Sequence, residues 1–265
     1  MIVRYESDGS IVMITQNDHA QLSGLFAAHW GNNQFERPRP YASLVRAAMF
    51  HDRGWIRYET GPQLNPETGK TPNYREVPNN RAQLEAFEWA GDWLGAIDAY
   101  AGLMIAKHRT GLWQGRYGAM THPPAIPRGT LAPEIVALIA RSEAKQKAAA
   151  ETFDPRELAI NYNLLQVWDL LSLYICSTEV LKPDRIAPVP LGYSGAAGVG
   201  MTLTPRDAGT IALDPYPFDQ PALATTMIFR RLPQTTFKDS AELQAAYFKT
   251  APQIASFQLV PGAAH

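Results

Sequence analysis

The feature that most constrains the fold of this 265-residue chain is one carboxylate in an otherwise apolar helical stretch. Asp169 lies in NYNLLQVWDLLSLYIC, where it shares a helical face with Tyr162, Leu165 and Leu173. A buried carboxylate without a partner has a raised pKa and costs several kcal/mol, so the fold must supply a counter-charge. A divalent cation satisfies such a group directly, and an arginine in the core is the alternative.

Histidines occupy similar positions in three other predicted helices. The doublet His51-Asp52 ends the apolar stretch YASLVRAAMFHDRGW, His19 lies on the apolar face of DHAQLSGLFAAHW, and His108 lies on that of AYAGLMIAKHRTGLW. Neutral imidazoles and carboxylates are suitable ligands for Fe, Mn, Ni, Co or Zn, and a donor set without thiols argues against a structural zinc site. The residue types therefore favour a divalent metal centre.

Each histidine also has an ordinary structural interpretation. A carboxylate nearby in the sequence can satisfy His51 at its helix end, and His19 can lie in a partly exposed first turn. His108 can complement the helix dipole at a C-terminal end. Two further histidines are weaker candidates, because His29 is rotated about 80° from the face of His19 and His122 lies in a proline-rich loop.

The order His, His-Asp, His, Asp along separate helices resembles the HD superfamily of metal-dependent phosphohydrolases. More narrowly, the chain resembles a bacterial HD-like family of unknown function. The resemblance is carried by ITQNDHAQLSG, AAMFHDRGW, Ala101–Trp113 and LLQVWDLLSLYIC. It implies that one metal ion is bound by His19, His51, Asp52 and Asp169. It also implies that His108 binds either a second ion, bridged by Asp52, or the phosphoryl group of a substrate.

The same resemblance implies a metal-dependent hydrolase that acts on a nucleotide or another small phosphoester through metal-activated water. The expected catalytic residues are His108, Lys107 and Arg109, with the two cations neutralising phosphate charge. Arg53 and Arg57 are further cations close to the doublet. Two alternatives stay open: a di-iron oxygenase on the same scaffold, and a non-catalytic sensor that binds a small ligand.

The composition changes once along the chain. Residues 17–182 have helical patterns, whereas residues 183–265 hold 10 of the 21 prolines, which break long helices. We expect a mainly α, single HD-like domain (α+β overall), with a helical metal-binding core at 17–182. Short β segments at 1–16 and 183–265 are expected to form a small accessory sheet. The expected helices cover about 18–30, 41–52, 80–93, 96–109, 132–152 and 154–179, and a long loop at 56–79 is expected to close over a site.

Charge and composition limit the partners. With 24 Lys and Arg against 25 Asp and Glu, the formal net charge of −1 provides no field that attracts nucleic acid or an anionic membrane. The sequence has no run of about 18 apolar residues and no signal-peptide pattern, which predicts a cytoplasmic protein. We expect a small phosphorylated molecule as the partner and leave homo-oligomerisation open. The single cysteine, Cys176, has apolar neighbours and is predicted to be a packed thiol.

Overall fold

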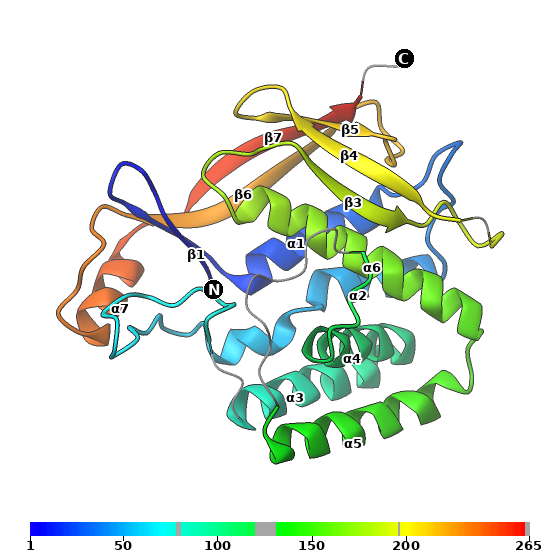
Figure 1. Cartoon of the computed structure of the whole chain (residues 1–265), viewed down its shortest axis with the longest axis horizontal. Helices are drawn as coiled ribbons and strands as arrows, with labels where there is room; N and C mark the ends of the chain where they lie inside the picture. Colours follow the sequence, from blue (N-terminus) through cyan, green and yellow to red (C-terminus); the bar gives the residue numbers. More distant parts are fainter. Residues whose placement is uncertain (78–80, 120–130, 196, 263–265) are drawn as a thin grey trace.

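A curled β-sheet covers one side of a group of helices in the computed structural model of the chain (Figure 1). The structure describes residues 1–77, 81–119, 131–195 and 197–262. Its helices are α1 (Gln16–Ala28), α2 (Tyr41–Phe50), the 3-10 helix η1 (Arg53–Arg57), α3 (Arg81–Ile97), α4 (Ala99–Trp113), α5 (Pro133–Ala150), α6 (Pro155–Cys176) and α7 (Ser240–Lys249). Its strands are β1 (Ile2–Tyr5), β2 (Ile11–Ile14), β3 (Asp184–Val189), β4 (Val199–Pro205), β5 (Thr210–Asp214), β6 (Leu223–Leu232) and β7 (Gln253–Pro261).

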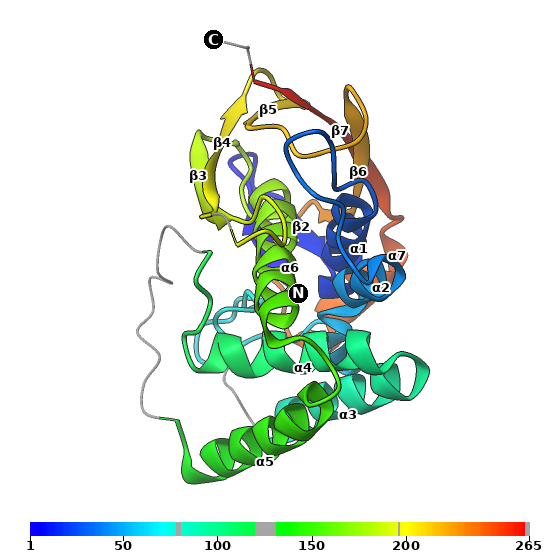
Figure 2. The same ribbon diagram turned by 90° about the vertical axis from the view of Figure 1, so that its right-hand side faces the viewer.

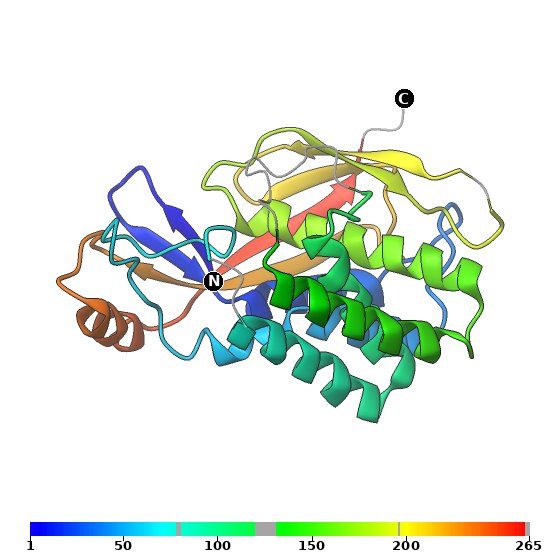
Figure 3. The same cartoon turned by 60° about the horizontal axis from the view of Figure 1, so that its bottom comes forward.

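The strands form one sheet in the order β1-β2-β6-β7-β5-β4-β3. β5 and β7 pair in parallel, and the other neighbouring strands are antiparallel. The first two strands are therefore joined to the C-terminal strands through the pairing of β2 with β6. Figure 2 shows the sheet arching over α1 and α6, while α3, α4 and α5 lie farther from it. Figure 3 shows α7 beside the β1–β2 hairpin at one end of the molecule.

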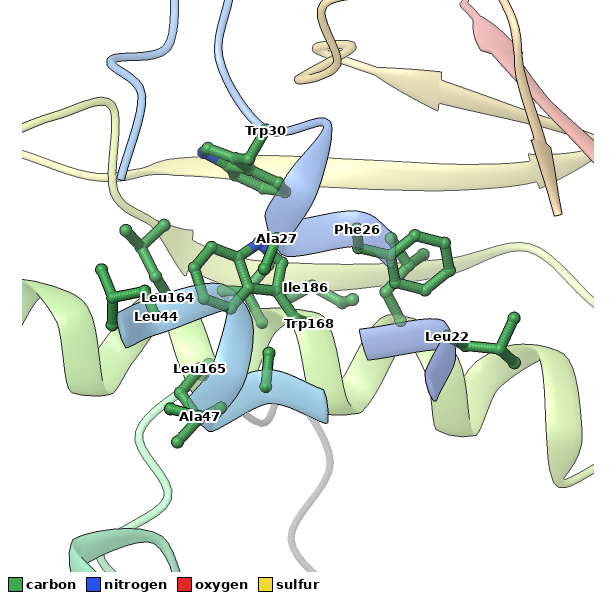
Figure 4. Close-up of a cluster of buried hydrophobic side chains, with 14 of the residues drawn as sticks. Leu22, Phe26, Ala27, Trp30, Leu44, Ala47, Leu164, Leu165, Trp168 and Ile186 are labelled. Atoms are coloured by element: carbon green, nitrogen blue, oxygen red, sulfur yellow. The ribbon is translucent and has the colours of Figure 1, made fainter. Parts of the chain in front are cut away.

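The main hydrophobic core lies between the sheet and the helices and takes side chains from both. Trp168 of α6 is fully buried, and its ring centroid lies 5.9 Å from that of Trp30. Figure 4 shows Trp168 near the centre of this core, among side chains of α1, α2 and β3: Ala27, Leu44 and Ile186. The sheet therefore forms one wall of the same core that holds α1, α2 and α6 together.

The predicted mainly α bundle with a small accessory sheet is wrong. The fold is α+β with a large seven-stranded sheet in the described part of the chain. The reason is visible in β4 and β5, where Met201, Leu203, Ile211 and Leu213 are fully buried and belong to the main core. Prolines in the C-terminal third suggest loops, yet β3 contains Pro188 as an edge strand, where a missing N–H is tolerated.

Helix positions follow the sequence expectations more closely, with shifted ends. Thr15 is the N-cap of α1, because its side chain accepts a hydrogen bond from the N–H of Asp18. Asp98 caps α4, and Asp154 caps α6 just before Pro155. These caps fix the start of the two helices that carry His108 and Asp169.

Two expectations from composition have simple outcomes. The prediction of a packed thiol at Cys176 is confirmed: the side chain is fully buried, and burial raises the pKa of the thiol. In the described part of the chain, none of the helices has the length and apolarity that crossing a bilayer requires.

Glycines allow α3 and α4 to cross closely, which sets the position of α4. A Cβ added at Gly102 would lie 2.4 Å from Cα of Gly95 and 2.9 Å from the carbonyl oxygen of Gly91. A Cβ added at Gly95 would meet no atom within 4 Å. The backbone of α4 therefore approaches α3 at a distance that only glycine permits at position 102.

We predict that Gly102→Ala lowers the free energy of unfolding by about 1–3 kcal/mol, because the new methyl group forces the two helices apart. Gly95→Ala is the matched control, and we expect no loss and a gain of up to about 1 kcal/mol from the higher helix propensity of alanine. Urea denaturation followed by circular dichroism measures both. Equal stability of the two variants would contradict the close crossing.

Candidate metal centre

Four helical segments bring five buried polar side chains to one place. His19 lies in the first turn of α1, His51 directly follows α2, and Asp52 directly precedes η1. His108 lies in α4 and Asp169 in α6. Each of the five side chains belongs to a residue that is at most 5% exposed. The structure thus places the five predicted residues together in the interior.

The separations between neighbouring donor atoms have the size expected for ligands of a metal ion. His19 Nε2 lies 3.1 Å from Asp52 Oδ2 and 3.7 Å from Asp169 Oδ1. His51 Nε2 lies 3.2 Å from Asp169 Oδ1, and His108 Nε2 lies 3.8 Å from Asp52 Oδ1. With metal–ligand bonds of about 2.1 Å, neighbouring ligands are about 3.0 Å apart in an octahedron and about 3.4 Å apart in a tetrahedron.

Several of these atoms have no other partner. Nε2 of His51, Nε2 of His108 and Oδ1 of Asp52 are buried and make no hydrogen bond within the residues that the structure describes. Unpaired buried polar atoms are rare and costly in folded proteins. A cation among them would satisfy all three, so the donor set fits a divalent metal ion.

Hydrogen bonds at Nδ1 orient two of the imidazoles. His51 Nδ1 lies 2.8 Å from the carbonyl oxygen of Ala48, which can only accept, so Nδ1 carries the proton and Nε2 of the neutral ring is a lone-pair donor. His19 Nδ1 lies 2.8 Å from Ser172 Oγ, and this hydroxyl donates to the carbonyl oxygen of Asp169. The same tautomer follows for His19. Such outer hydrogen bonds are typical of metal-bound histidines.

The charges of these side chains shift one another's pKa values. Burial favours the neutral form of His51, yet the negative charges of Asp169 and Asp52 raise the pKa of His51 to about 9. Burial alone would raise the pKa of Asp169, but His51, His108 and His19 lower it to about 2. Burial lowers the pKa of His108 below its ordinary value. Two carboxylates thus stay ionised here and require positive charge, as bound protons or as a metal ion.

The two predicted catalytic cations lie in different surroundings. Lys107 is half-buried, with Nζ 5.7 Å from the ring centroid of Tyr162. The Arg109 guanidinium lies 3.7 Å from the ring centroid of Phe87 and 4.7 Å from that of Trp113. Arg109 therefore packs into an aromatic cluster on the side of α4 that faces α3.

Of the two weaker candidates, only His29 lies in the described structure, and it does not join the centre. His29 follows α1 and lies 3.0 Å from Asp219, where it is partly exposed. His122 lies outside the described residues. The long loop expected at 56–79 contains Tyr74, and burial raises the pKa of this phenol to about 12.

Sequence reasoning missed two hydroxyl groups that contact the ligand set. Ser172, three residues after Asp169 on α6, accepts from His19, and its position on the same helical face could have indicated it. Tyr117 donates to Asp169 Oδ2 at 2.5 Å and lies 3.4 Å from His108 Nδ1. Tyr117 follows α4 in an irregular segment, where no periodicity marks it.

Comparison with known proteins places the chain in a family. A family of proteins of unknown function, DUF3891, matches residues 1–234, and the chain belongs to this family. No curated protein and no solved structure matches the chain. The predicted membership of the HD superfamily is wrong, because the matching family is DUF3891 and the helices pack under a large curled sheet instead of forming the expected bundle.

We predict that His51→Ala and Asp52→Ala each remove bound metal. Loss of a ligand should weaken binding by more than the ~10–100-fold that loss of an outer hydrogen-bond partner costs. Elemental analysis after reconstitution with Mn²⁺, Fe²⁺, Co²⁺, Ni²⁺ or Zn²⁺ measures the metal content, and far-UV circular dichroism should show retained helicity.

The matched control is His29→Ala, which removes a partly exposed imidazole outside the centre. It should keep the metal content of the unaltered chain. Full metal content in His51→Ala would refute the assignment of the centre.

Proposed function

We propose that this chain is a metal-dependent hydrolase that acts on a small phosphoester, such as a nucleotide. The observation that carries the proposal is the convergence of three imidazoles and two ionised carboxylates in the interior, as two groups of possible ligands that share His51. A bound divalent ion would supply a Lewis acid for a phosphoryl oxygen and would acidify a water molecule. His19, His51, Asp52 and Asp169 would hold this ion, and His108 would hold the same ion, a second one or the phosphoryl group.

Charge supports an anionic substrate. A divalent ion cancels the charges of Asp52 and Asp169, so the loaded centre no longer repels an anion. Lys107, which is next to His108 in α4, would then contribute positive charge, with Nζ 5.7 Å from the ring centroid of Tyr162. Burial and then the nearby Arg116 lower the pKa of Lys107, and the charge of Glu143 opposes this shift.

The other cations near the doublet are engaged with aromatic rings. The guanidinium of Arg57 lies 4.1 Å from the ring centroid of Trp89, and that of Arg53 lies 5.3 Å from that of Trp93. Among the described residues, Lys107 forms no ion pair within 4 Å. We assign Lys107 to the substrate phosphate because it is next to His108 in α4. The assignment of a catalytic role to Arg109 stays a prediction.

We predict that the metal-loaded chain releases phosphate from members of a panel of nucleotides and small phosphoesters. Phosphate release should fall to background in His51→Ala. Lys107→Met should raise KM by roughly 10- to 100-fold, because a hydrogen bond to a charged group contributes about 1.5–3 kcal/mol. A colorimetric phosphate assay with each metal measures these effects.

The matched control is Lys145→Met, which removes an exposed lysine of α5 that pairs with Glu88 and Asp92 of α3. It should leave KM unchanged. A metal-loaded chain that releases no phosphate would refute the hydrolase. Oxygen uptake by the iron-loaded chain would then identify an oxygenase, and thermal stabilisation by nucleotides without turnover would identify a sensor.

A further inference from the structure

The hydroxyl of Tyr117 lies between two residues of the centre. It donates to Asp169 Oδ2 at 2.5 Å, and its oxygen lies 3.4 Å from His108 Nδ1. The ring centroids of Tyr117 and His108 are 5.6 Å apart, and the tyrosine is buried. No other described side chain contacts both His108 and Asp169 by hydrogen bonds.

Counting protons fixes the direction of these contacts. A phenol has one proton, and an ionised carboxylate can only accept, so the proton of Tyr117 points to Asp169 Oδ2. The phenolic oxygen can then only accept from His108, which places the imidazole proton on Nδ1. Nε2 of His108 is left as a lone-pair donor, like Nε2 of His19 and His51.

The same hydrogen bond divides the two oxygens of Asp169. Oδ2 is engaged by Tyr117, whereas Oδ1 faces the imidazoles, at 3.2 Å from His51 Nε2 and 3.7 Å from His19 Nε2. With Oδ2 engaged in this way, Asp169 offers one oxygen to an ion. The five residues then supply at most five ligands if each of them binds through one atom.

We propose that Tyr117 is a positioning residue that restricts Asp169 to one ligand oxygen and orients His108, so that one position of a six-coordinate ion stays free for water or substrate. This inference rests on the proposed metal-dependent function. The hydroxyl of Tyr117, in the segment after α4, would then decide whether that position stays free or is filled by Asp169. Without the phenolic proton, Oδ2 of Asp169 would be free to bind the ion as a second ligand atom.

The main chain around Tyr117 is held independently of its hydroxyl. The N–H of Arg116 donates to the carbonyl oxygen of Gly111 at 2.8 Å, and the N–H of Ala119 donates to Gln166 Oε1 at 3.2 Å. Tyr117→Phe keeps the ring and both of these bonds. The variant therefore changes the hydroxyl contacts and leaves the path of the segment in place.

The first experiment compares the unaltered chain and Tyr117→Phe, both saturated with Mn²⁺, by water-proton relaxation. We expect the relaxivity per bound ion to fall by about half or more in Tyr117→Phe, because Asp169 displaces coordinated water. Tyr162→Phe is the matched control: its hydroxyl donates to the main chain of Arg116 and to neither Asp169 nor His108, so its relaxivity should be unchanged. Equal relaxivity per bound ion in Tyr117→Phe and the unaltered chain overturns the proposal.

The second experiment needs no variant. Proton NMR of the Co²⁺-loaded chain should show three shifted, solvent-exchangeable N–H signals, one from Nδ1 of each of three Nε2-bound imidazoles. A spectrum without the His108 signal overturns the proposal. Failure of the unaltered chain to bind Mn²⁺ or Co²⁺ overturns both this inference and the hydrolase. Loading without phosphate release refutes the hydrolase alone and leaves the relaxivity result to decide the role of Tyr117.

Discussion

Two ionised carboxylates in the interior are the constraint on which the rest of this structure depends. Asp52 and Asp169 are 5% and 3% exposed, and three imidazoles present their Nε2 atoms to them. Such a group is stable only when positive charge lies among its members, because desolvated carboxylates without a counter-charge cost several kcal/mol each. The surrounding helices and sheet hold the donor atoms of these five side chains 3.1–3.8 Å from their neighbours.

The helices that carry the five candidate ligands are fixed from two sides. The sheet packs on α1 and α6 through a shared core, which sets the positions of His19 and Asp169. On the other side, α4, which carries His108, packs closely on α3 at Gly102. His51 and Asp52 need no long helix, because they lie at the junction of α2 and η1. Metal binding would therefore stabilise contacts between elements that are far apart in the sequence.

The site was easier to predict than the fold, for a physical reason. An ionisable residue on an apolar helical face is conspicuous in any sequence, and all five predicted ligands converge. The sheet depends on pairings such as β2 with β6, more than 200 residues apart, and no local pattern encodes these. Proline in β3 also concealed a strand that an edge position tolerates. Tyr117 was not predicted, because its contact with Asp169 forms only where an irregular segment folds back onto α6.

The wrong assignment to the HD superfamily also came from a sequence pattern that carries no information about long-range pairing. The order His, His-Asp, His, Asp describes the ligands that a metal centre needs, and these ligands can be carried by more than one arrangement of helices and strands. Here the helices that carry them pack under a seven-stranded sheet in a family of unknown function. A ligand order therefore constrains the chemistry of a site more than the architecture around it. The outer contacts of this group, in particular those of the hydroxyls of Tyr117 and Ser172, lie outside the pattern from which the resemblance was inferred.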